Sequence, residues 1–353
     1  LSNVPSQIEK DIIELDRRVN LLYSALEGKI MRIFPVPNDI NNKWISFPEI
    51  SEYNYEGADS LYVNNVLNLY FQTLRVARQD QDYTQSEELL ESIKGFQKKY
   101  GSNVMPSDFK INSEVVYNKA DIFNRLYKWY LFAGLGLLLI LIFQIFYDNK
   151  FSSHLIKLFE SLIITLFVFN TVGLIARWYI AGHAPWSDAY ESIIFVAWAT
   201  VIFGIIFGRK SYFTLASSTF VASIILSIAN MNWLDPSIAN LQPVLDSYWL
   251  MIHVAVIVGS YGPFAIGMIL GIVTLILTII ATKKNRKTFS RKLEELTIVN
   301  ELSLTIGLVM LTIGNFLGGM WANESWGRYW GWDPKETWAL ISIIIYTAVL
   351  HLR

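Results

Sequence analysis

The part of the sequence whose residue types and spacing could support chemistry is segment 321–338, which contains WGRYWGWDPKETW. Its tryptophans are Trp321, Trp326, Trp330, Trp332 and Trp338. Several indole rings suit a large planar ligand that binds by stacking, and Gly327 and Gly331 either let the backbone approach such a ligand or turn the chain. The segment is therefore either a platform for a planar cofactor or lipid headgroup, or an aromatic belt at a membrane interface.

The residues after the last glycine have a local structural explanation. Asp333 is placed to cap the following helix, with Pro334 at its first position. Glu336, three residues after Asp333, completes a capping-box pattern. Asp333 is thus either a helix cap alone or also a ligand contact, and the sequence leaves both open.

Imidazole chemistry is restricted to His154, His183, His253 and His351. His253 lies near one end of a long apolar run, where an ionisable side chain indicates a functional site. A neutral imidazole there is either a metal or haem ligand, or is bonded to a neighbouring helix. His183 either lines the same mouth or bonds to loop backbone. His154 is expected to be solvated, and His351 lies at the opposite membrane face from His253.

Composition divides the chain and excludes several kinds of site. Of the 353 residues, 53% are hydrophobic and 17% are charged, against about a quarter charged in soluble domains. Residues 1–127 are polar and mixed, whereas 128–353 are mostly apolar runs. The chain has no cysteine, which excludes disulfides, thiolate nucleophiles and cysteine metal sites. The net charge of −1 gives no indication of a nucleic-acid partner.

Residues 1–127 predict a small helical domain. The first helix spans 6–28, with a capping box at Ser6 and Glu9. Its apolar residues recur at spacings of three and four and are expected to face a core: Ile8, Ile12, Leu15, Val19, Leu22 and Leu26. A loop rich in proline and asparagine follows, and further helices are predicted at 59–79 and 84–101.

The remaining sequence predicts an all-α, polytopic membrane domain with about seven spans of about 20 residues each. The candidate spans are 128–147, 156–176, 189–208, 212–230, 249–281, 299–320 and 334–352. The fifth run would reach roughly 50 Å as a helix, which requires tilt or extension into water. Gly262-Pro263 allows a kink in it.

Basic residues in the connecting loops predict the orientation. The turn at Arg209 and Lys210 and the loop with Lys283 and Lys284 are expected to be cytoplasmic. The loop 231–248 has no basic residue and is expected outside. Alternation then places residues 177–188, residues 319–333 with the tryptophan-rich stretch, and residues 1–127 outside. Because the sequence begins at Leu1 and ends within an apolar run, it is also interpreted as part of a longer polypeptide.

Segment 321–338 resembles the tryptophan-rich WWD motif of a family of haem-handling membrane proteins. The segments RWYIAGHAPWSDAYESIIFVAW, YWLMIHVAVIVGSYG and YTAVLHLR support the resemblance in the order that this family shows. The chain is most similar to system II cytochrome c synthetases of the CcsA or ResC type, which are often fused to a CcsB or ResB part. The resemblance covers roughly residues 165–353, and residues 1–127 would be the end of a CcsB-like part.

The resemblance implies a holocytochrome c synthetase, or haem lyase. Such a protein delivers haem b to the outer face and promotes thioether attachment to the CxxCH motif of an apocytochrome c. It implies that His253 is an outer ligand of the haem iron and that His351 is a transmembrane one. The implied cofactor-binding residues of the motif are Trp326, Gly327, Trp330, Trp332, Asp333 and Trp338. The second ligands would lie beyond residue 353 and in the CcsB-like portion upstream.

Two other functions remain open from the sequence. One is a haem transporter or chaperone that passes haem to a separate ligation enzyme, because haem-delivery relatives share the motif. The other is a structural or lipid-binding membrane protein with an aromatic-rich outer loop. No catalytic acid or base is assigned, and no group of His, Asp and Glu has zinc spacing.

Overall fold

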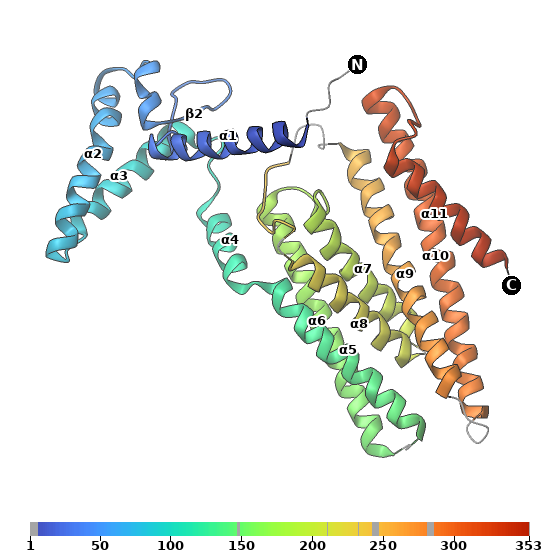
Figure 1. Cartoon of the computed structure of the whole chain (residues 1–353). Helices are drawn as coiled ribbons and strands as arrows, with labels where there is room; N and C mark the ends of the chain where they lie inside the picture. Colours follow the sequence, from blue (N-terminus) through green and yellow to red (C-terminus); the bar gives the residue numbers. More distant parts are fainter. Residues whose placement is uncertain are drawn as a thin grey trace. The chain divides into compact units, whose positions relative to one another are not determined.

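The computed structural model describes residues 6–146, 149–209, 211–231, 233–241, 247–280 and 286–352 (Figure 1). It forms two compact units, Leu1–Ser107 and Asp108–Arg353. The boundary expected at residue 127 falls inside a helix, α5 (Ile122–Phe146). Lys210, Lys283 and Lys284, which contributed to the predicted orientation, lie outside the described residues.

The first unit contains α1 (Gln7–Leu26), α2 (Gly57–Asp80) and α3 (Thr84–Gly101), at the three predicted places. It also has an antiparallel strand pair that the sequence did not indicate, β1 (Arg32–Pro35) and β2 (Trp44–Ser46), followed by the short 3-10 helix η1 (Phe47–Glu52). The strands are only four and three residues long, too short to show an alternating pattern.

The core of the first unit forms around Phe96 of α3. The Phe96 ring stacks on Tyr62 of α2, with ring centroids 5.3 Å apart, and meets Phe34 of β1 edge-on at 6.4 Å. Phe34, Ile45 and Val63 are fully buried. Apolar burial of this kind joins α2, α3 and the strand pair into one unit.

The packing expected for α1 was wrong. Its capping box forms as predicted, but the helix has no buried residue, and its apolar residues are 56–79% exposed. The periodicity of a sequence identifies the apolar face of a helix, but it does not identify the element that covers that face. No other described element of the first unit covers the apolar face of α1.

The second unit begins with α4 (Asp108–Ala120) and continues into a bundle of long helices. After α5 come α6 (Lys150–Ala181), α7 (Ala189–Gly208), α8 (Tyr212–Ala229), α9 (Tyr248–Ile280), α10 (Arg286–Trp326) and α11 (Pro334–His351). These helices run side by side (Figure 1). The predicted all-α, multi-pass membrane fold is confirmed.

Six helices in the described part of the chain are long and apolar enough to cross a membrane. They coincide with the first six predicted spans. The seventh predicted span forms α11, but α11 is not among the six. Its first turn carries Lys335 and Glu336, and its last residue is His351, so its apolar stretch is shorter than the about 20 residues of a typical span.

Small residues bring neighbouring helices close together in the second unit. Gly204 of α7 faces Ser218 of α8, and Gly262 of α9 lies against the backbone of Ala199 in α7. Helix α9 is continuous through Pro263. Close backbone approach is a common way for membrane helices to associate, because lipid tails remove the hydrophobic drive between them.

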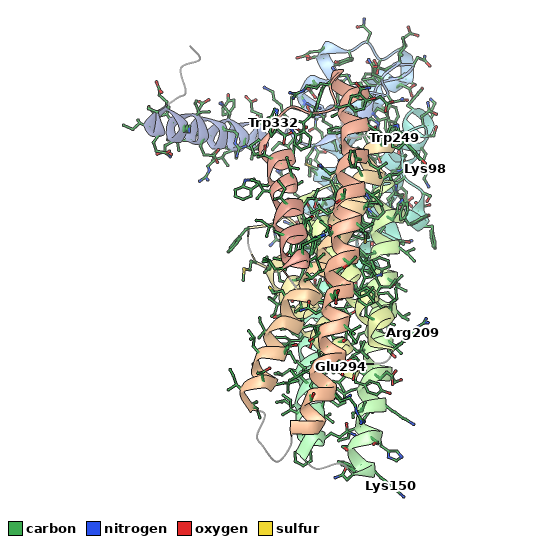
Figure 2. The ribbon with its side chains drawn as sticks, turned by 90° about the vertical axis from the view of Figure 1, so that its right-hand side faces the viewer. Lys98, Lys150, Arg209, Trp249, Glu294 and Trp332 are labelled. Atoms are coloured by element: carbon green, nitrogen blue, oxygen red, sulfur yellow. The ribbon has the colours of Figure 1, made fainter. Side chains whose placement is uncertain are left out.

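Figure 2 places Trp249 and Trp332 toward one end of this bundle and Arg209, Glu294 and Lys150 toward the opposite end. The start of α9 and the tryptophan segment therefore share one end of the second unit. The turn after α7 lies toward the other end.

Candidate functional site

A cavity of about 640 Å³ lies within the second unit. Its walls come from the first half of α9, the end of α10, the connection after α10 and the first turns of α11. This volume falls in the range of about 300–1,000 Å³ that is usual for small-molecule and cofactor sites. The lining is mostly apolar and aromatic, with a few polar groups, which suits an amphipathic ligand.

His253 lines this cavity and is held in a narrow slot. Its side chain is 9% exposed and stacks on Trp321, with ring centroids 5.5 Å apart and ring planes 25° apart. On α10, Gly318 lies beneath the same imidazole, where a Cβ atom would come within 3.3 Å of the ring. Gly318 and Trp321 are three residues apart on one helix, so they share a face.

The hydrogen bond of His253 determines its tautomer. Nδ1 lies 2.9 Å from the carbonyl oxygen of Trp249, one turn earlier in α9. A carbonyl only accepts, so Nδ1 carries the proton and Nε2 keeps its lone pair. This is the usual arrangement of a metal-binding histidine, in which one ring nitrogen is fixed by backbone and the other is left for the metal.

The structure brings several predicted site residues together in the cavity wall. They are His253, Trp326, Trp330, Asp333 and Trp338. Trp321, which the sequence placed in the aromatic segment but not among the ligand contacts, also lines the cavity and meets Trp326 at 4.7 Å between ring centroids. The His253, Trp321 and Trp326 rings thus form a connected series. These two indoles and those of Trp330 and Trp338 are called the aromatic wall.

Two predicted contact residues, Gly327 and Trp332, do not line the cavity. Gly327 has φ +70° and donates its N–H to the carbonyl of Asn323 at 2.9 Å, which ends α10 in the usual left-handed manner. Trp332 is 71% exposed and also has a positive φ, +57°. Left-handed backbone is unusual for a tryptophan, and here it turns the chain into α11.

The capping pattern at the start of α11 is present. Asp333 Oδ1 accepts the N–H of Glu336 at 2.8 Å. Glu336 Oε2 accepts the N–H groups of Gly331 at 2.7 Å and of Asp333 at 3.4 Å. Asp333 both caps the helix and lines the cavity, so its role as a cap does not prevent it from also contacting a ligand.

Polar residues lie at both ends of the cavity lining. Lys335 and Glu336 come from the first turn of α11, next to the aromatic wall. Farther along the helices, the lining includes Tyr261 of α9 and Asn315 of α10. Tyr261 lies eight residues after His253, which corresponds to about 12 Å along a helix. The cavity lining therefore extends along α9 well beyond His253.

A second polar site, which the sequence reading missed, lies between α6 and α7. The Arg177 and Glu191 side chains are each 1% exposed and form an ion pair with 2.7 Å between Nε and Oε1. Asp188, the N-cap of α7, lies 4.0 Å from the guanidinium. Burial raises the pKa of Asp188, although its hydrogen bond from the backbone of Glu191 acts in the opposite direction.

This ion pair anchors the segment that leads to α9. Arg177 donates to the carbonyls of Pro236 and Ser237, at 2.8 and 3.0 Å. The indole N–H of Trp186 donates to the carbonyl of Met251 at 3.0 Å, two residues before His253. The α6–α7 connection therefore holds the helix end that carries His253.

His183 belongs to this connection and not to the cavity lining. Its Nε2 lies 3.2 Å from the carbonyl of Ala239, and its Nδ1 lies 3.1 Å from the hydroxyl of Ser187. These contacts favour the alternative in which His183 bonds to loop backbone. His351 is exposed at the end of α11, with Nδ1 2.8 Å from the carbonyl of Thr347, and it does not share the cavity with His253.

Some of the missed residues could have been found from the sequence. Helix α10 runs to Trp326, so the first six residues of segment 321–338 are helical, and helical spacing would have paired Gly318 with Trp321. Arg177 adjoins the predicted span 156–176, and Glu191 lies inside the predicted span 189–208, where charged residues are rare and usually paired. The identity of the pair requires the tertiary structure.

Known proteins resemble the chain over most of its length. The sequence profile of a family described as Cytochrome C assembly protein matches residues 186–353. Protein NrfI of Wolinella succinogenes is 40% identical over 98% of this chain, which spans 38% of the length of that relative. The cytochrome c biogenesis protein CcsA of a Prochlorococcus marinus strain is 32% identical over 68% of the chain and 83% of its own length. A Synechococcus CcsA is 34% identical over 63% of the chain and 82% of its own length.

Proposed function

Because the chain belongs to the CcsA family of cytochrome c biogenesis proteins, we propose that its cavity binds haem b at the outer face of a bacterial cytoplasmic membrane. We propose further that the protein promotes attachment of this haem to the CxxCH motif of an apocytochrome c. The observation that carries the proposal is the slot around His253, a residue of the aromatic cavity lining whose Nδ1 is held by the backbone carbonyl of Trp249.

The donor set of the cavity fits haem. Neutral imidazole is a common axial ligand of haem iron, and His253 is held in the tautomer that can bind a metal. Trp321, Trp326, Trp330 and Trp338 offer apolar aromatic surface to a flat macrocycle. Haem would supply the iron and the two vinyl groups that react.

The chain's own contribution to the reaction is positioning. Adding a thiol across a vinyl group forms a C–S bond and moves the thiol proton to the neighbouring carbon, so the atoms balance without an oxidant. Holding two reactants in reactive geometry supplies much of such a rate increase. The cavity carboxylates of Asp333 and Glu336 already accept backbone N–H groups, and His253 is assigned to iron. We therefore assign no acid–base catalyst to this chain.

The proposed partners follow from this role. They are an apocytochrome c with CxxCH, a CcsB- or ResB-like portion, and the lipid bilayer, which the apolar helices must face. Segment 321–338 and the first unit would lie on the periplasmic side. His351 is kept as a candidate ligand for a second haem position nearer the cytoplasm.

Replacement of His253 tests the proposal. In the full-length protein, His253→Ala should abolish or shift the Soret band of bound haem and lower cytochrome c maturation. His154→Ala is the matched control, because His154 is exposed and bonds only its own helix backbone among the described contacts. An unchanged Soret band and unchanged maturation in His253→Ala would refute the assignment.

Co-expression with a CxxCH apocytochrome separates attachment from delivery. Covalent haem that forms without other maturation proteins supports a synthetase. Haem that is bound but never attached under these conditions favours a haem transporter or chaperone that passes haem to a separate enzyme.

A further inference from the structure

Trp186 joins the α6–α7 connection to the helix that carries His253. Its indole N–H donates to the carbonyl oxygen of Met251 at 3.0 Å. Met251 lies in the first turn of α9, which begins at Tyr248. A helical carbonyl also accepts the N–H four residues later, so the indole uses the second lone pair of this oxygen. The bond is therefore an additional contact that reaches the first turn from outside α9.

The same first turn carries the acceptor that fixes the tautomer of His253. The Trp249 carbonyl, one residue after the start of α9, lies 2.9 Å from Nδ1. Helix ends fray, and fraying of this turn would carry the Trp249 carbonyl away from the imidazole. The ring would then be free to move its proton to Nε2. A contact that holds the first turn of α9 therefore also keeps the lone pair of His253 on Nε2.

The indole of Trp186 is itself held in a fixed direction. Its ring meets Trp178 edge-on at 5.7 Å and Phe195 at 4.8 Å between centroids. The next residue, Ser187, donates its backbone N–H to Glu191 Oε2 at 2.9 Å. The other oxygen of that carboxylate belongs to the buried ion pair described above. Both the ring and the adjoining backbone of Trp186 are thus anchored before its N–H reaches α9.

From these contacts we infer that Trp186 is a positioning residue for His253. It holds the first turn of α9, and through the Trp249 carbonyl it keeps Nε2 of His253 directed and available for iron. The inference rests on the proposed function, because that function makes His253 a ligand of haem iron. Trp186 is not among the described residues that line the cavity, so its effect on a bound haem passes through α9.

Trp198 of α7 provides a matched control for Trp186. Its indole N–H donates to Thr171 Oγ1 at 2.9 Å, and its ring stacks on Phe195 at 5.6 Å. Trp186 and Trp198 are both half-buried. Substitution by Phe removes one hydrogen bond and keeps an aromatic ring at either position, but only the bond of Trp186 ends on α9.

Hydrogen exchange of the full-length protein without haem tests the contact with α9. Trp186→Phe should speed exchange in residues 248–254 about fivefold, which corresponds to about 1 kcal/mol, the usual contribution of one hydrogen bond. Trp198→Phe should leave exchange in these residues unchanged. Equal exchange in the two variants would show that Trp186 does not hold the first turn of α9, which overturns the inference.

Comparison of haem with metal-free protoporphyrin IX tests the effect on iron ligation, because the two share the flat ring and only haem can bind Nε2. In detergent, Trp186→Phe should weaken haem binding about threefold or more by Soret titration. It should leave the affinity for protoporphyrin IX unchanged, as measured by porphyrin fluorescence, and Trp198→Phe should alter neither affinity.

The pattern of the two affinities separates the possible results. An equal loss for both porphyrins in Trp186→Phe, or no loss for haem, would overturn the positioning role. A wild-type protein that binds haem no more tightly than protoporphyrin IX, or that binds neither, would instead refute the proposed iron ligation by His253. The hydrogen-exchange comparison does not depend on haem and still tests the contact between Trp186 and α9.

Discussion

Trp330 and Trp332 stand two positions apart in the same motif, but their environments differ. Trp330 lines the cavity and has a buried indole nitrogen. Trp332 meets the Trp330 ring edge-on, at 5.6 Å between centroids, yet it is mostly exposed and outside the cavity lining. A motif in which both residues look alike therefore contains one candidate ligand contact and one residue that turns the chain.

Alanine substitutions at these two positions should have unequal effects. Trp330→Ala removes a cavity wall and should weaken haem binding about tenfold or more, because a buried aromatic ring contributes several kcal/mol of contact. Trp332→Ala should weaken it less, by about threefold at most. Soret titration of the two purified variants measures the difference, and a larger effect at Trp332 would contradict the assigned wall.

At the scale of helices and connections, the Arg177–Glu191 pair joins α6 to α7 and anchors the segment before α9. Removing one partner of a buried ion pair leaves an uncompensated charge, which typically costs about 3–5 kcal/mol. Replacing both partners by apolar residues costs much less. We therefore expect the effects of substituting Arg177 and Glu191 on stability to be strongly non-additive in a double-mutant cycle.

We expect Arg177→Met alone to lower the thermal unfolding temperature more than the double variant Arg177→Met, Glu191→Leu. Arg177→Met should also speed hydrogen exchange in residues 233–241, because two of its hydrogen bonds end on carbonyls there. Mass spectrometry of the detergent-solubilised protein measures that exchange. Additive effects of the two substitutions would show that the pair is not coupled.

The close approach of α9 and α7 gives a second expectation at this scale. A Cβ atom at Gly262 would lie 2.8 Å from the carbonyl carbon of Ala199, which is backbone and cannot move aside. Gly262→Ala should therefore destabilise the fold by about 1–3 kcal/mol.

Gly271→Ala provides the matched control for Gly262→Ala. The nearest atom to a Cβ at Gly271 is 3.9 Å away, so this variant should be neutral or up to about 1 kcal/mol more stable through helix propensity. Thermal unfolding in detergent compares the two variants, and equal unfolding temperatures would contradict the close contact.

The elements were predictable where one local signal determines them. Long apolar runs gave the helices of the bundle, and Asp333 with Glu336 gave the start of α11, because capping depends on residues three apart. The exposure of α1, the pairing of Arg177 with Glu191 and the stacking of His253 on Trp321 were not predictable, because each depends on elements distant in the sequence. The family resemblance identified His253 and most tryptophans of the cavity lining as candidate haem contacts. The position of Trp321 in that lining became clear only from the tertiary structure.

At the scale of the whole molecule, the membrane orientation is a prediction that the chain itself makes easy to test. It contains no cysteine, so a single introduced thiol gives an unambiguous label. In intact spheroplasts, a membrane-impermeant maleimide should label Asp235→Cys and Glu91→Cys but not Arg209→Cys.

Permeabilised membranes provide the control for this labelling, and there all three variants should react. Asp235 precedes α9, Glu91 belongs to the first unit, and Arg209 follows α7; all three are exposed. Labelling of Arg209→Cys in sealed spheroplasts would reverse the assigned orientation.

The slot that holds His253 between Gly318 and Trp321 also has a thermodynamic consequence. A free histidine side chain samples several rotamers, and fixing such a side chain on binding costs about 0.5–1.5 kcal/mol. Here stacking, the hydrogen bond to Trp249 and the contact with α10 already fix the ring. Most of that entropy is lost during folding, so a metal that binds Nε2 would gain affinity from a ligand whose direction is set before it arrives.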